Sequence, residues 1–132
     1  MSDAPFPHPL GEKIKSAKGW DSAMRELMLA SKVLPVLPLA QRTDENKVAG
    51  CQSQVWLAFD EQQAGFLAWS DAKIIRGVLA VLLEKANGHS VRLDESTYVN
   101  YMHELGLHRY LSESRANGIT AVIRRLCLAG DF

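Results

Sequence analysis

The stretch that most constrains this chain is residues 72–86, which is apolar around most of its circumference if it is helical. A helix at a protein surface keeps its apolar residues on one stripe, so a helix apolar on several sides has to be covered by other elements. We therefore expect it to be the central buried helix. Ser70 and Asp71 are predicted to cap its start, and Asn87-Gly88 to end it. Gly77 inside it costs about 1 kcal/mol relative to alanine, which indicates close approach of the sheet or of a neighbouring helix.

Two short apolar segments before this helix predict a β-hairpin. Residues 55–60 and 66–69 are rich in valine, leucine and aromatic side chains, which favour strands. Only residues 61–65 separate the two segments, and so short a connection requires antiparallel strands. A further short strand is expected over residues 46–49. The sequence thus predicts a sheet of two or three antiparallel strands.

Helices are predicted on both sides of this unit. Their ranges are residues 10–17, a helix capped by Asp21 that ends at Leu34, residues 97–105 capped by Ser96, and residues 113–128 capped by Ser112. The predicted stops are Gly19, Pro35 and Gly106. Helices packed on a small antiparallel sheet make an α+β fold.

Length and composition exclude several classes of function. The 132 residues suffice for one domain, 1–132, in which residues 1–9, with three prolines, are expected to be a flexible arm. Fifteen basic and fifteen acidic residues cancel, which argues against a nucleic-acid partner. No apolar run approaches the roughly 18 residues that span a bilayer, so no membrane association is expected. The N-terminus lacks the pattern of a signal peptide, and two distant cysteines favour a reducing cytoplasm.

Cys51 is the candidate reactive residue. It follows Gly50, which can adopt backbone angles closed to other residues, and it precedes the strand at 55–60. Such a turn lies at the rim of a scaffold, where reactive groups are displayed. A buried structural cysteine is the alternative, because cysteine is among the most buried residue types. Cys127, by contrast, stands at an apolar position of the last helix and is predicted to be a core residue, with Arg125 turned outward.

The residues around Cys51 resemble the signature of the SufE/CsdE sulfur-acceptor proteins, which serve cysteine desulfurases. The similar stretches, in the family's order and spacing, are Gly50-Cys51-Gln52-Ser53-Gln54-Val55-Trp56, Ser70-Asp71-Ala72 with Ile74, Ile75 and Gly77, Leu79-Ala80-Val81-Leu82, and Ser114-Arg115-Ala116-Asn117-Gly118-Ile119. Two stretches together lean towards the CsdE branch, namely Glu104-Leu105-Gly106-Leu107 and Arg76-Gly77-Val78-Leu79-Ala80-Val81-Leu82-Leu83. One departure is visible, because Ala68-Trp69 stand where the family usually has a Gly-Asp pair.

The resemblance implies a SufE/IscU-like fold and a sulfur relay. A pyridoxal-phosphate-dependent cysteine desulfurase would hold sulfur as a persulfide, and the Cys51 thiolate would take it and pass it to an iron–sulfur scaffold or another acceptor. In this family the cysteine loop tucks the thiol into an apolar pocket and turns outward to meet the partner, with Gly50 as the hinge here. The resemblance implies that Asp71 helps to hold the loop and that Arg115 lies near the cysteine and the partner. Gln52, Ser53 and Gln54 complete the supporting set. The protein would be an accessory carrier rather than an enzyme, without a metal or cofactor of its own.

Two other functions stay open. In a hydrolase, Cys51 would be the nucleophile and His103 or His108 the base, but the sequence indicates neither a fixed base nor an oxyanion hole. An IscU-like iron–sulfur scaffold is the other, although a cluster typically takes about four thiolates and this chain has two cysteines. The histidines show no ligand spacing with either cysteine; they are His8, His89, His103 and His108.

Overall fold

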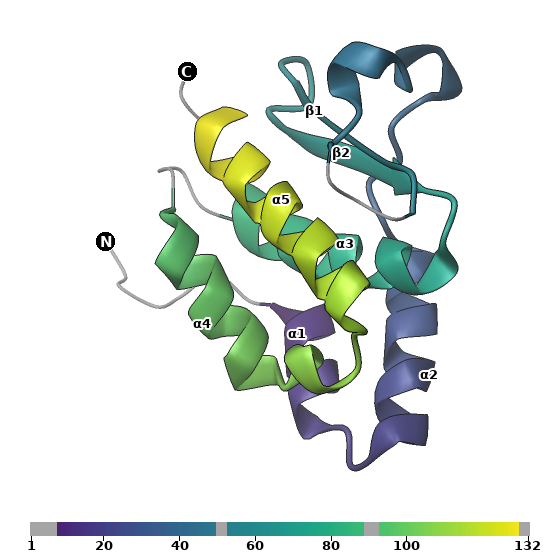
Figure 1. Ribbon diagram of the computed structural model, residues 1–132, viewed down its shortest axis with the longest axis vertical. Coiled ribbons are helices and arrows are strands. Elements are labelled where there is room, and N and C mark those ends of the chain that lie inside the picture. Colours follow the sequence, from purple (N-terminus) through teal and green to yellow (C-terminus); the bar gives the residue numbers. More distant parts are fainter. Residues whose placement is uncertain (1–7, 50–52, 89–92, 130–132) are drawn as a thin grey trace.

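Helices pack against a small two-stranded sheet in a computed structural model that describes residues 8–49, 53–88 and 93–129. In chain order the helices and strands are α1 (Pro9–Ser16), α2 (Trp20–Ser31), β1 (Val55–Asp60), β2 (Gly65–Ser70), α3 (Lys73–Asn87), α4 (Glu95–Leu105) and α5 (Glu113–Ala129). The single-turn helices η1 (Leu39–Gln41) and η2 (Asp44–Asn46) lie between α2 and β1, and η3 (Leu107–Arg109) lies between α4 and α5. Figure 1 shows the hairpin at one end of the molecule and α1 and α2 at the other. The predicted α+β fold is confirmed. No helix within the described ranges is long and apolar enough to cross a membrane.

The hairpin has the predicted antiparallel register, from Val55 opposite Ser70 to Asp60 opposite Gly65. Side chains alternate between the two faces of a sheet. Val55 and Leu57 are buried on the face that meets the helices, together with their cross-strand partners Ser70 and Ala68.

The edges of the hairpin carry isolated bridges instead of a third strand. Lys47 pairs with Trp56 on one edge, and Val36 pairs with Ala68 on the other. The prediction of a strand over residues 46–49 is therefore wrong, because Asn46 still belongs to η2 and Lys47, although extended, forms only an isolated bridge.

Helix α3 is the central helix, as predicted. It contacts α2 and β2, and α5 lies in front of it in Figure 1. The side chains or backbone atoms it buries belong to Ile75, Gly77, Val78, Leu79, Ala80, Val81, Leu82 and Leu83. At Gly77 a Cβ atom would overlap the backbone carbonyl of Leu27 in α2. Gly77 thus allows the two helix backbones to touch, which confirms the predicted close approach.

Capping by Ser70 and Asp71 is not observed. Ala72 is the N-cap of α3 and makes no side-chain capping bond. The buried Ser70 hydroxyl accepts a hydrogen bond from the Ala72 N–H at 3.2 Å, and the Asp71 carboxylate binds outside the helix.

Two further predicted caps are each wrong by two residues. Gly19, with φ 88°, is the N-cap of α2, so Asp21 lies in the first turn. Asp94 caps α4 by accepting the Thr97 N–H at 2.9 Å, and it also accepts the Ser96 hydroxyl. Hydrogen bonds from the Thr97 side chain and backbone, and then from Ser96, lower the pKa of Asp94. Aspartate and serine are about equally good N-caps, so composition alone did not separate Asp94 from Ser96.

The last helix begins as predicted and carries the second cysteine. The Ser112 hydroxyl accepts the Arg115 N–H at 3.3 Å. Cys127 is partly buried and packs against the core. Burial, and then the nearby Cys127 thiol, raise the pKa of Tyr98 to about 12. The described surroundings of Cys127 are thus those of a packing residue.

Candidate functional site

The three central residues of the predicted site, Gly50, Cys51 and Gln52, lie outside the described residues. The structure describes the chain up to Ala49 and again from Ser53. The site is therefore built from what holds these two flanks and from what surrounds Ser53.

Asp71 holds the flank that follows Cys51. Its carboxylate Oδ1 accepts the Gln54 N–H at 3.0 Å, and its own N–H donates to the Gln54 carbonyl at 3.3 Å. These two bonds continue the hairpin by one residue pair beyond Val55 and Ser70. Asp71 thus binds both backbone groups of the residue three positions after the cysteine.

Strand β1 and helix α5 hold the flank that precedes Cys51. The Val48 N–H donates to the Val55 carbonyl at 2.8 Å, and the Val48 side chain is buried. The Arg125 guanidinium donates to the carbonyls of Glu45 at 2.6 Å and Lys47 at 3.2 Å. Arg125 was predicted to point outward; it instead folds onto this segment, because three-residue turns leave carbonyls without helical partners.

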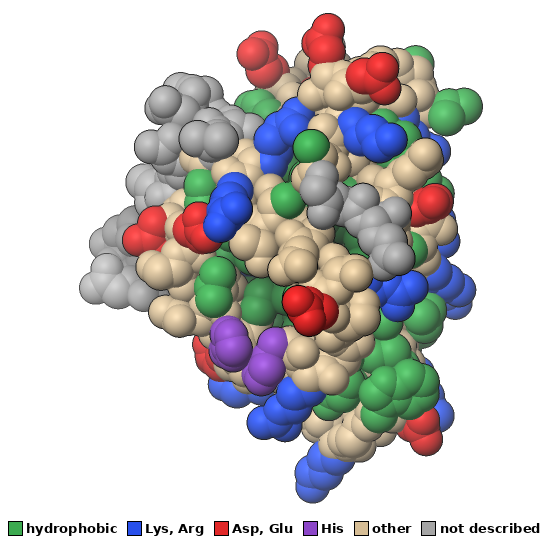
Figure 2. Space-filling view, in the orientation of Figure 1, with side chains coloured by type: hydrophobic (Ala, Val, Ile, Leu, Met, Phe, Trp, Pro, Cys, Tyr) green, Lys and Arg blue, Asp and Glu red, His purple; other side chains and the backbone are tan. Residues whose placement is uncertain are grey.

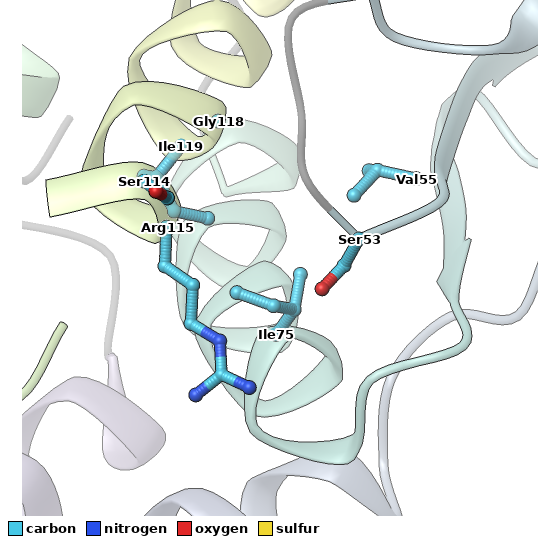
Figure 3. Close-up of a pocket in the computed structure, with 7 residues that line it drawn as sticks. All are labelled: Ser53, Val55, Ile75, Ser114, Arg115, Gly118 and Ile119. Carbon is cyan, nitrogen blue, oxygen red and sulfur yellow. The ribbon is translucent and has the colours of Figure 1, made fainter. Parts of the chain in front are cut away.

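A small cavity opens between Ser53 and the helices. It has room for about one water-sized group. Its lining comes from the cysteine flank, β1, α3 and the first two turns of α5, and consists of Ser53, Val55, Ile75, Ser114, Arg115, Gly118 and Ile119 (Figure 3). Aliphatic side chains form most of the wall, and Gly118 leaves space because it has no side chain.

Arg115 brings a positive charge to this cavity. In Figure 3 its side chain runs from α5 past Ile75, while Ser53 lies across the cavity. An apolar wall favours the neutral form of a thiol, and a neighbouring guanidinium favours the thiolate. A cavity of this size and lining accommodates a small, weakly polar group. The ionisation of such a group depends on its distance from the Arg115 guanidinium.

The structure brings the described members of the predicted set together in two pairs. Ser53 and Arg115 line one cavity, and Gln54 and Asp71 are hydrogen-bonded. The prediction missed Arg125, whose contacts lie far away in sequence. It also expected an apolar pocket without naming its wall, although Gly118, Ile119 and Ser114 belong to the last of the similar stretches. That stretch was the signal that could have found them.

His103 and His108 lie at a different place. Their rings are 4.2 Å apart between centroids, and they line a hollow of about 120 Å³ between α4 and α5, seen as the purple pair in Figure 2. Partial loss of solvent, and then the charges of His103 and Arg109, lower the pKa of His108. Neither histidine lines the cavity at Ser53. Within the described ranges no three His, Cys, Asp or Glu side chains form a group that could hold a metal ion.

Fold and site together define a small α+β protein in which the two described flanks of Cys51 are held by hydrogen bonds, and Ser53 on the second flank lines a cavity together with Arg115. The sequence profile of the SufE family, described as "Fe-S metabolism associated domain", matches residues 9–128. The chain belongs to the SufE family.

Curated relatives agree with this assignment. The sulfur acceptor protein CsdE of Escherichia coli (strain K12) is 33% identical over 114 residues, which are 83% of this chain and 78% of that protein. An uncharacterized SufE-like protein of Rhizobium meliloti (strain 1021) is 37% identical over 116 residues, 81% of each chain. A SufE-like protein of Haemophilus influenzae is 28% identical over 124 residues, 89% of this chain and 98% of that protein. Each match covers most of the length of the relative.

Proposed function

We propose that this protein, acting as one domain, is a sulfur acceptor that takes sulfur from a pyridoxal-phosphate-dependent cysteine desulfurase onto Cys51. It then passes the sulfur to an iron–sulfur scaffold or another acceptor. It works as an accessory carrier that stimulates the desulfurase, not as a catalyst of its own reaction. The reducing cytoplasm suits this role, because thiols there stay free of disulfides and the carrier has to offer a free thiol to the desulfurase.

The transfer is a thiol–persulfide exchange. The Cys51 thiolate attacks the terminal sulfur of the desulfurase persulfide, the S–S bond of that persulfide breaks, and the desulfurase cysteine leaves as a thiolate. The product is Cys51–S–SH. Because the oxidation state of the transferred sulfur does not change, no external oxidant or reductant is required.

The observation that carries the proposal is how the flanks of Cys51 are built. Val48 and Gln54, on either side, are fixed to β1 and Asp71, and the next described residue, Ser53, lines a cavity of thiol size that also holds Arg115. A carrier thiol needs a sheltered position that limits oxidation and a nearby cation that supports the thiolate. The membership of the SufE family and the likeness to a protein named as a sulfur acceptor support this chemistry.

Intact-mass measurement tests this function. After incubation with a cysteine desulfurase and cysteine, the wild type should gain about 32 Da per sulfur accepted. The matched control is Cys127→Ser, which should gain the same mass and should stimulate the desulfurase as the wild type does. Cys51→Ser should gain none and should not stimulate it. Sulfur accepted by folded Cys51→Ser would show that Cys51 is not the acceptor.

A further inference from the structure

Two arginines converge on one tryptophan at the end of the hairpin that carries the cysteine flank. The guanidinium carbons of Arg42 and Arg76 each lie 4.3 Å from the centroid of the Trp69 ring. Arg42 comes from the turn after η1, where its Nε donates to the Leu37 carbonyl at 2.9 Å, and Arg76 comes from α3. Trp69 is half-buried on β2, at the position where this chain departs from the usual Gly-Asp of the family.

These two positive charges are not neutralised by described residues. Neither guanidinium has a carboxylate within 4.0 Å among them. Because both guanidinium carbons lie 4.3 Å from the same ring centroid, the two charges are separated by at most twice that distance. This separation is less than a Debye length of about 10 Å, so the two charges repel. A guanidinium stacked on an aromatic ring still presents its N–H donors at its edge, in the fork geometry that matches a carboxylate.

Exposed apolar side chains adjoin this pair of charges. Val36 is 46% exposed and bridges to Ala68, the residue before Trp69. Leu39 is 77% exposed, and its carbonyl accepts the Arg42 N–H at 3.0 Å. Cationic donors next to exposed aliphatic groups form the mixture found at protein–protein interfaces, where arginine and tryptophan are enriched. We call Arg42, Trp69, Arg76, Val36 and Leu39 the Trp69 surface.

The Trp69 surface lies beside the cysteine flank. Trp69 stands two residues before Asp71, which binds Gln54, and so is about 7 Å from it along the strand. Ile75 lines the cavity at Ser53, and the next residue, Arg76, reaches Trp69. A typical interface of about 800 Å² on each partner has a radius of about 16 Å. An interface of this size around the cysteine flank is therefore large enough to include the Trp69 surface.

We infer that the Trp69 surface binds an acidic patch, with carboxylates next to apolar side chains, on the desulfurase that loads Cys51. This inference rests on the proposed function, which requires that desulfurase to bring its persulfide to Cys51. Carboxylates from the partner remove the repulsion between Arg42 and Arg76, and Val36 and Leu39 lose their contact with water.

The test compares charge removal at this surface with the same charge removal elsewhere. The variant is Arg42→Gln/Arg76→Gln, and the matched control is Lys13→Gln/Lys18→Gln, at exposed positions near the opposite end of the molecule. Calorimetry gives the Kd for the cysteine desulfurase of the same organism at low salt and at about 0.3 M salt. The variant should bind roughly tenfold more weakly at low salt and lose most of its salt dependence. The control should stay within about twofold of the wild type.

Each outcome supports or overturns the inference. Alkylation of Cys51 by iodoacetamide should proceed at the wild-type rate in the variant, which separates docking from thiol chemistry. A folded variant with wild-type Kd, or one impaired only in passing sulfur to a downstream acceptor, overturns the inference. If the glutamine variant does not fold, Arg42→Lys/Arg76→Lys keeps the charges but loses the donor fork, and unchanged affinity there overturns it equally. A wild type that gains no sulfur mass refutes the proposed function instead.

Discussion

Replacing Gly77 by alanine has two opposite effects on the free energy of unfolding. Alanine is favoured over glycine by about 1 kcal/mol inside a helix. The added Cβ, however, would overlap the carbonyl oxygen of Leu27 and lie 2.9 Å from its carbonyl carbon and 3.2 Å from its Cα. These are backbone atoms of α2 and cannot turn away as a side chain does, so α2 and α3 have to separate.

The structure therefore predicts a net loss of stability. Overpacking of a core costs about 1–3 kcal/mol. We expect a cost in the upper half of this range, because the atoms that the added Cβ would overlap belong to the backbone of α2. After the gain in propensity, the free energy of unfolding should fall by about 1–2 kcal/mol. The urea midpoint should fall by about 0.5–1 M, with an unchanged dependence on denaturant.

Asn100→Ala is the matched control, because Asn100 is an exposed interior residue of α4. It isolates the propensity effect and should raise the free energy of unfolding by a few tenths of a kcal/mol. A Gly77→Ala protein as stable as the wild type, or more stable, would mean that the backbones of α2 and α3 are not in contact and would refute the reasoning.

Two further predictions concern the flank of Cys51 and the second cysteine. Asp71→Ala removes the acceptor of the Gln54 N–H, and the loss of about 1 kcal/mol should speed hydrogen exchange at the Gln54 amide about fivefold. Asp71→Asn keeps an oxygen acceptor and should leave this exchange near the wild-type rate. Equal exchange in all three proteins would show that the bond does not hold the flank. Cys127→Ser should lower the free energy of unfolding by about 1 kcal/mol in urea titrations, and a loss above about 3 kcal/mol would contradict the partly buried position of Cys127.

The sequence predicted the elements whose signals are local. The hairpin strands begin and end within one residue of prediction, since a short connection between two apolar segments leaves few alternatives. The buried character of α3 and the tight packing at Gly77 followed from composition and from the expense of a glycine within a helix.

The errors in the site arose where a polar side chain binds a distant part of the chain. Asp71 looked like a cap because it precedes a helix, but its carboxylate binds Gln54, 17 residues away. Glu84 provides the first N–H groups of α1 with an acceptor, binding the Leu10 N–H at 2.9 Å across 74 residues. Arg125 binds carbonyls about 80 residues away. Local patterns give a polar residue a local partner, whereas the folded chain offers several partners, and only the tertiary arrangement decides between them.

The alternation of side chains along the hairpin bears on how such a protein can change partners. Val55 faces the helices and lines the cavity at Ser53, whereas its neighbour Trp56 and the cross-strand partner of Trp56, Trp69, face the other side. A substitution at Trp69 thus alters the outer face of the hairpin and leaves the cavity wall unchanged. The departure from the family at Ala68-Trp69 is therefore compatible with unchanged sulfur chemistry, and it falls on the surface that we propose as the desulfurase-binding site.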